Sequence, residues 1–177
     1  DHRDLHSFPT RRSSDLLRPH ELQLGFLKFL PGAPIKNKIR PHKYQYQSIP
    51  PYELISNKEL SAEEVDYLKK FADIFDRFYN SKRFRFSIAH LLQKMDPVTL
   101  FDRLLQHHES NNLFMNPIAL DKQYKIFQQT FFTNPSIENK DLLKLDYLYS
   151  QRAYRLPDFL DRKSTRLNSS PREISYA

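Results

Sequence analysis

Residues 61–84, SAEEVDYLKKFADIFDRFYNSKRF, contain the clearest helix signal of this chain. Ser61 is followed three residues later by Glu64, the spacing of a capping box, in which each side chain bonds a backbone amide of the other residue. Apolar residues then recur every three or four positions, as on one face of a helix: Val65, Leu68, Ala72, Phe75 and Tyr79. Leu60 and Val65 are spaced as a hydrophobic staple. We predict a helix that begins after Ser61 and ends near Asn80.

The following sequence predicts four more helices. One covers residues 84–94. The next begins at Asp96 and Pro97, an N-cap residue and a first-turn proline, and its expected inner face is Val98, Phe101, Leu104, Leu105 and His108. Asn116 and Pro117 repeat this start signal, before Leu120, Tyr124, Phe127 and Phe131. A last helix is expected over residues 137–151, with Leu142, Leu145, Leu148 and Tyr149 as its apolar residues. The irregular spacing of these starts does not suggest a solenoid repeat.

The sequence before Ser61 predicts strand and loop. Residues 22–30 suit a buried strand that ends at Pro31 and Gly32, and residues 52–55 suit a brief second strand. We therefore expect a mainly α fold, in which a domain of about five helices follows a strand and loop segment. The expected division is a strand and turn over 17–35, an extended linker over 36–60 and the helical domain over 61–160.

Composition limits the functions open to the chain. The 177 residues include 28 Lys and Arg against 21 Asp and Glu, a formal net charge of +7, which by itself does not indicate a nucleic-acid partner. The sequence has no Cys, which excludes disulfides, thiolate zinc sites and cysteine-bound iron–sulfur clusters within this chain. No apolar run approaches the ~20 residues of a membrane helix. We expect a cytoplasmic protein with no membrane partner.

The two ends differ in composition from the interior. Residues 1–16 and 161–177 are rich in Ser and Arg, whereas the interior has more Lys than Arg. Residues 1–15 and 161–170 match translations of the two adapters used in sequencing libraries. We interpret both ends as adapter-derived and disordered, and the interior as a library-insert fragment of a longer protein; two native disordered tails are the alternative. Without these ends the formal charge of the interior is +5.

Two short clusters raise the question of chemistry. Lys82–Phe86, KRFRF, alternates bases with aromatics, which can bind phosphates and stack bases, although packing with Phe inward and Arg outward is the favoured interpretation. His107 and His108 precede Glu109, but neighbouring residues on a helix point about 100° apart and so do not converge on one metal ion. We therefore predict no metal site and no catalytic residue in this chain.

Four strings together resemble the C-terminal region of cobalamin-dependent radical SAM proteins, and are similar to the anaerobic magnesium-protoporphyrin IX monomethyl ester cyclase group. They are LRPHELQLGFLKFLPGAPI at 17–35, PPYELISNKELS at 50–61, FYNSKRF at 78–84, and LLKLDYLYSQR with LPDFL between 142 and 160. In that group an uncharacterised helical domain follows the radical SAM barrel. One departure is Lys82, where the family's turn is expected to have Gly, and this weakens the expectation of a special backbone conformation.

The resemblance implies a role for each part. Residues 22–30 would be the last barrel strand, and the helical domain would be an accessory domain of a bacterial enzyme. The four-iron four-sulfur cluster, S-adenosylmethionine and cobalamin would bind to the upstream barrel and cobalamin domain of the same parent chain, so this chain would contain no cofactor-binding residue. A substrate pocket or interface could involve Tyr52, Tyr79, Arg83 and Phe84.

Two other functional hypotheses remain open. One is a stand-alone basic helical module that binds a protein or a nucleic acid through Lys82, Arg83 and Arg85, although the small charge of the interior argues against nucleic acid. The other is a purely structural domain without a ligand.

Overall fold

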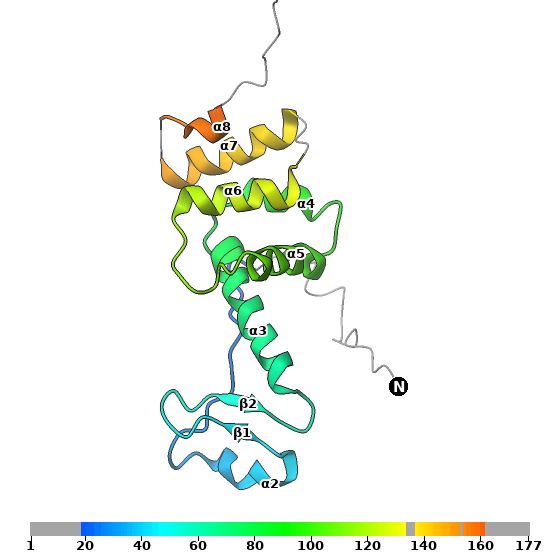
Figure 1. Cartoon of the computed structure of the whole chain (residues 1–177), viewed down its shortest axis with the longest axis vertical. Coiled ribbons are helices and arrows are strands. Elements are labelled where there is room, and N and C mark those ends of the chain that lie inside the picture. The colour runs from blue at the N-terminus through cyan, green and yellow to red at the C-terminus, as the bar shows by residue number, and fades with distance from the viewer. Residues whose placement is uncertain (1–18, 134–136, 153, 162–177) are drawn as a thin grey trace, which may run out of the picture.

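A computed structural model describes residues 19–133, 137–152 and 154–161; the end segments expected to be adapter-derived lie outside the described residues, apart from Asp161. Figure 1 shows an elongated molecule with a small lobe at one end and a stack of helices at the other, and one long helix, α3 (Ala62–Phe75), reaches from the small lobe to the stack. The described residues are mainly helical, which confirms the predicted fold class.

The small lobe consists of short elements: η1 (Pro34–Lys38), α2 (Ile39–His42), and the strands β1 (Gln45–Tyr46) and β2 (Leu54–Ser56), which pair antiparallel. Residues 36–60, expected as an extended linker, lie within these elements and the turns between them. Phe29, Leu54 and Val65 form the buried core of this lobe, and the ring of Phe29 stacks on Tyr46 with centroids 4.4 Å apart. Since Val65 belongs to α3, the first turns of that helix complete this core.

The helical lobe contains the remaining elements in chain order. They are α3 (Ala62–Phe75), its π-helical continuation η2 (Asp76–Asn80), α4 (Arg85–Leu91), α5 (Pro97–Ser110), α6 (Leu120–Phe131), α7 (Ile137–Gln151) and α8 (Asp158–Asp161). A second hydrophobic core lies among them and is rich in rings, with Phe84 stacked on Phe127 at 4.8 Å between centroids. The two cores share no buried residue, so α3 joins two separately packed lobes.

Two predicted helix starts are confirmed by their caps. The Ser61 hydroxyl accepts the Glu64 amide at 3.2 Å, and a Glu64 carboxylate oxygen accepts the Ser61 amide at 2.7 Å, so the capping box is complete. The Asp96 carboxylate accepts the Thr99 amide at 3.0 Å and caps α5. The start predicted at Asn116 is wrong, because α6 begins only at Leu120 and its N-cap position is Ala119.

The inner faces of α5 and α7 differ from the predicted ones. Val98 is 62% exposed, although the rest of the predicted α5 face, including His108, is buried. On α7 the predicted Leu145 and Tyr149 are exposed, whereas Leu143 and Asp146 are buried. The physical reason is the contact of α7 with α4, where the Asp146 carboxylate accepts the amides of Phe86 and Ser87. A charged residue thus occupies a buried position, which an apolar pattern does not reveal.

Residues 19–30 form an extended segment that follows α3 from the helical lobe to the small lobe (Figure 1). The Asn80 side chain bonds both the amide and the carbonyl of Leu22, at 3.1 and 2.9 Å, and the Tyr79 hydroxyl donates to the Pro19 carbonyl at 2.6 Å. Only Lys28 forms a β-bridge, with Glu53, and among residues 22–30 only Phe29 is buried. The segment predicted as a buried strand is therefore extended but largely exposed.

Candidate functional site

The four residues predicted to line a pocket or interface do not form one site. Tyr52 lies in the small lobe, where its carbonyl accepts the Phe29 amide at 2.8 Å. Tyr79, Arg83 and Phe84 lie at the turn between η2 and α4, in the helical lobe. Tyr52 therefore belongs to a different part of the molecule (Figure 1).

Phe84 is a core residue. Its ring is fully buried and lies 4.5 Å from Tyr124 and 4.8 Å from Phe127, measured between ring centroids. Tyr79 is partly buried, and the Lys82 ammonium lies over its ring, 4.8 Å from the centroid. Phe84 is therefore not accessible to a ligand. Tyr79 contacts the Lys82 ammonium through its ring.

The turn at residues 81–83 has a special backbone conformation. Lys82 has a φ of 60°, the left-handed region that favours glycine. The Lys82 amide donates to the Tyr79 carbonyl at 3.1 Å, and the Ser81 hydroxyl donates to the Arg77 carbonyl at 2.7 Å. Lys in place of the expected Gly weakened the expectation of a special conformation, but that conformation is present, and the surrounding hydrogen bonds hold the turn with Lys in it.

This turn forms one wall of a hollow that we call the basic groove. The opposite wall is the end of α7, and the volume between them is about 700 Å³. The lining residues are Ser81, Lys82, Arg83, Leu148, Tyr149, Ser150, Gln151 and Arg152. Of the predicted site residues, Arg83 lines this hollow. Arg152 was not predicted, because it lies 69 positions away from Arg83 along the chain.

The two walls of the basic groove are connected through Tyr124 of α6. Its hydroxyl donates to the Arg83 carbonyl at 2.8 Å and lies 2.9 Å from the Ser150 hydroxyl oxygen. Burial raises the pKa of Tyr124, so the phenol keeps its proton and remains a donor at neutral pH. An Arg83 guanidinium nitrogen, Nη1, also donates to the Gln123 side-chain oxygen at 3.3 Å. These bonds hold Arg83 in place from two sides.

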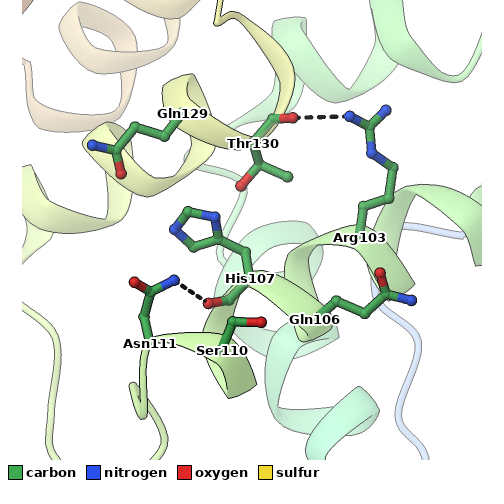
Figure 2. A pocket seen from close by; sticks show the side chains of 7 residues that line it. All are labelled: Arg103, Gln106, His107, Ser110, Asn111, Gln129 and Thr130. Carbon is green, nitrogen blue, oxygen red and sulfur yellow. Dashed lines mark hydrogen bonds between the residues drawn. The ribbon is translucent and has the colours of Figure 1, made fainter.

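A second hollow lies between α5 and α6 (Figure 2). It measures about 310 Å³ and is lined by Arg103, Gln106, His107, Ser110, Asn111, Gln129 and Thr130. Arg103 donates to the Thr130 carbonyl at 3.0 Å and Asn111 donates to the His107 carbonyl at 2.8 Å. The Arg103 guanidinium also lies over the Phe131 ring. The Arg103 contacts therefore join α5 to α6.

The adjacent histidines of α5 point apart. His107 borders the hollow of Figure 2, whereas His108 is fully buried against Phe78 and Phe114. His108 Nδ1 lies 2.7 Å from the Leu104 carbonyl oxygen, and burial lowers the pKa of this imidazole, so it is neutral at pH 7. No group of three or more potential metal ligands occurs among the described residues.

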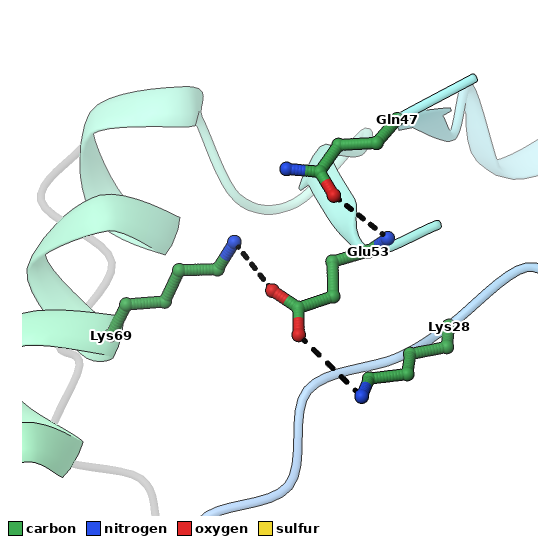
Figure 3. A network of polar contacts seen from close by, with 4 residues as sticks. All are labelled: Lys28, Gln47, Glu53 and Lys69. Carbon is green, nitrogen blue, oxygen red and sulfur yellow. Dashed lines mark hydrogen bonds and ion pairs between the residues drawn. The ribbon is translucent and has the colours of Figure 1, made fainter. Parts of the chain in front are cut away.

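Two carboxylates have clear structural roles. Burial raises the pKa of Asp146 to about 6, and this carboxylate accepts the amides of Phe86 and Ser87 at 2.7 and 2.9 Å. Glu53 contacts Lys69 of α3 at 3.0 Å and Lys28 of the extended segment at 3.7 Å (Figure 3). The hydrogen bond from Lys69 lowers the pKa of Glu53. Glu53 thereby connects the hairpin, α3 and the extended segment.

These observations describe a mainly helical domain with a small β lobe and an open basic groove, and no assembled catalytic constellation among the described residues. The chain belongs to the family described as proteins of unknown function, DUF4080, whose match covers residues 40–174. The match includes most of the lobe before α3, and at the other end it continues past Asp161, where adapter-derived sequence was expected to begin. No curated protein and no solved structure matches the chain. None of the helices in the described ranges has the length and apolar character needed to cross a membrane.

Proposed function

We propose that this chain is the C-terminal accessory domain of a cobalamin-dependent radical SAM enzyme and packs against the preceding barrel of the same parent protein. The observation that supports the proposal best is a row of exposed leucines on residues 19–30, which we call the leucine strip. It consists of Leu22, Leu24, Leu27 and Leu30, which are 43%, 43%, 38% and 53% exposed. The same residues lie within the string that most resembles the end of a radical SAM barrel.

The leucine strip favours a docked partner for an energetic reason. Burying a large aliphatic side chain stabilises a structure by about 1.5–3 kcal/mol, and clustered exposed apolar side chains mark interaction sites. Phe29 of the same segment is already buried in the core of the small lobe, whereas the four leucines keep exposed surface that is open to a partner. Within the described residues, the segment forms one β-bridge, between Lys28 and Glu53. An upstream barrel that covers these leucines would add further β-pairing to this segment.

Of the cofactors implied by the resemblance, the iron–sulfur cluster does not fit the residues of this chain. A cysteine-ligated iron–sulfur cluster needs thiolates, and the sequence has none. No three metal ligands come together in the described ranges. Under the proposal the cluster, S-adenosylmethionine and cobalamin belong to the upstream domains, and this domain supports the barrel and shapes its surroundings.

The genomic DNA that flanks the coding segment tests the family assignment. We expect an upstream reading frame that continues into this one and encodes a Cys-x-x-x-Cys-x-x-Cys motif and a cobalamin domain. A start codon directly before Leu17, with no such frame upstream, would contradict the proposal.

Amide hydrogen exchange tests the docking of the leucine strip. In the full parent protein, the amides of residues 22–30 are expected to exchange more slowly than in the present chain, and Leu24→Asp should remove that extra protection. The matched control is Val98→Asp, which places the same charge at an exposed apolar position of α5. Equal exchange rates over residues 22–30 in both proteins would refute docking through this strip.

A further inference from the structure

The basic groove gathers three cations that have no carboxylate partner. No ion pair within the described ranges joins Lys82, Arg83 or Arg152 to an Asp or Glu, although ion pairs do engage Lys28, Lys69, Lys70, Arg77 and Lys144. The nearest carboxylate on α7, Asp146, is buried and directed at the amides of α4. The groove therefore has an excess positive charge that its own surroundings do not neutralise.

The cations supply the charged donors of the groove, whereas both serine hydroxyls that line it are already engaged. The Ser81 hydroxyl donates to the Arg77 carbonyl, and the Ser150 hydroxyl is engaged with Tyr124 and the Tyr147 carbonyl. Arg83 uses Nη1 for Gln123 and has four further N–H bonds. A ligand here would accept charge-assisted hydrogen bonds, which are roughly twice as strong as neutral ones.

Two of the cationic residues, one on each wall of the groove, have a left-handed backbone conformation. Lys82 has a φ of 60° and Arg152 a φ of 49°. A non-glycine residue in this region is uncommon and occurs mainly at helix ends and at functional sites. Here it follows the ends of η2 and α7, and in both cases it brings a cation to the groove.

We propose that the basic groove binds a small molecule that has a phosphate monoester group. Lys82, Arg83 and Arg152 surround the phosphate, whose several acceptor oxygens match their N–H donors. The volume of about 700 Å³ suits a small-molecule site, for which roughly 300–1,000 Å³ is usual. Tyr149 is 63% exposed, stands edge-on to Phe86 and offers its ring to the organic part of the ligand.

A polynucleotide fits these observations less well than a small molecule. A single strand needs cations and aromatic rings spread along a track, because successive phosphates are each bound in turn. Here the three cations line one hollow between the turn and the end of α7. The inference does not depend on the proposed function, since none of the residues that line the groove belongs to the leucine strip.

The binding test compares adenosine monophosphate with adenosine, by NMR titration of the isotope-labelled chain. Adenosine monophosphate is expected to shift the amide signals of residues 81–83 and 149–152, with a dissociation constant in the range of about 0.01–1 mM. Adenosine should shift them at least about tenfold less at equal concentration, because loss of a charge-paired group costs a tenfold or larger factor. Inorganic phosphate should compete.

Variants locate the site. Arg83→Gln and Arg152→Gln are each expected to weaken adenosine monophosphate binding by about tenfold or more. Arg103→Gln makes the same change in the hollow of Figure 2 and should leave binding within about twofold. Thermal melting of each variant shows whether it is folded. The Arg152 side chain has no hydrogen bond or ion pair to another described residue, so its variant separates loss of binding from loss of structure.

Three results would overturn the proposal. The first is the absence of any amide shift at about 10 mM adenosine monophosphate, which would place the dissociation constant above the expected range. The second is equal weakening by Arg103→Gln and Arg83→Gln, which would indicate diffuse attraction. The third is tighter binding of a short single-stranded RNA whose affinity falls steeply with salt, which would assign the groove to nucleic acid.

Discussion

The pH dependence of stability should reveal the buried carboxylate of Asp146. Its pKa is about 6 in the folded protein and 3.8 in an ordinary, solvated environment. Between these values the folded state binds more protons than the unfolded state. The contribution of Asp146 to stability is therefore fully present below pH 3.8 and is lost as the pH rises through about 6.

The expected size follows from linkage. Each pH unit between the two pKa values changes the free energy of unfolding by about 1.4 kcal/mol. When the pH falls from 7.5 to 5, only the last unit, from about 6 to 5, lies below the folded pKa of Asp146. Protonation of Asp146 over this unit stabilises the protein by about 1.4 kcal/mol. Other carboxylates titrate as well. The pKa of Glu53 is lowered in the folded protein, so the contribution of Glu53 to stability is lost in acid. The Asp146 term must therefore be measured as a difference between two proteins.

Asp146→Asn provides that difference, because asparagine has a similar shape and does not titrate. Urea unfolding, followed by circular dichroism, gives the free energy of unfolding of both proteins at pH 7.5 and pH 5. The wild type should gain about 1.4 kcal/mol relative to the variant as the pH falls. The contributions of distant carboxylates cancel in this comparison. A difference that stays constant with pH, or one that moves in favour of the variant, would refute the reasoning.

Three further changes have expected outcomes. Lys82→Gly should be more stable than Lys82→Ala by about 1 kcal/mol, because both lose the ammonium and only glycine relieves the left-handed φ; equal stability in urea would contradict the assigned turn. Phe84→Ala should cost about 3–5 kcal/mol in unfolding free energy, whereas Val98→Ala should stay within about 0.5, and similar losses would show that the core is misassigned. Ser61→Ala should cost about 1 kcal/mol through loss of the α3 cap, with an unchanged urea midpoint as the contrary result.

The parts of the fold that local signals determine were predictable. The capping box at Ser61 and the Asp96 cap follow from side chains within a few residues of each helix start. The ring-rich core was partly predictable too, since Phe101, Leu104 and Phe127 lie on the expected faces. These features depend on short-range geometry, which a sequence pattern records directly.

The parts that depend on distant contacts were not predictable. Asp146 is buried because the amides of α4, about 60 positions away, need an acceptor, and nothing near Asp146 in the sequence indicates this. Arg152 reaches the groove of Arg83 only because Tyr124 ties the two walls together. Residues 36–60 have few helical or alternating patterns, and their short elements are held instead by packing around Phe29.

The helix α3, as the joint between two separate cores, has a consequence for folding cooperativity. The core of the small lobe has three buried apolar side chains, one of them Val65 of α3, and a unit of this size is marginal without external support. That support comes from the first turns of α3 and from the Glu53 contacts with Lys28 and Lys69. Heating should therefore melt the small lobe before the ring-rich lobe, so that unfolding occurs in two steps. Amides of residues 28–58 would then exchange through openings that leave α5 and α6 intact.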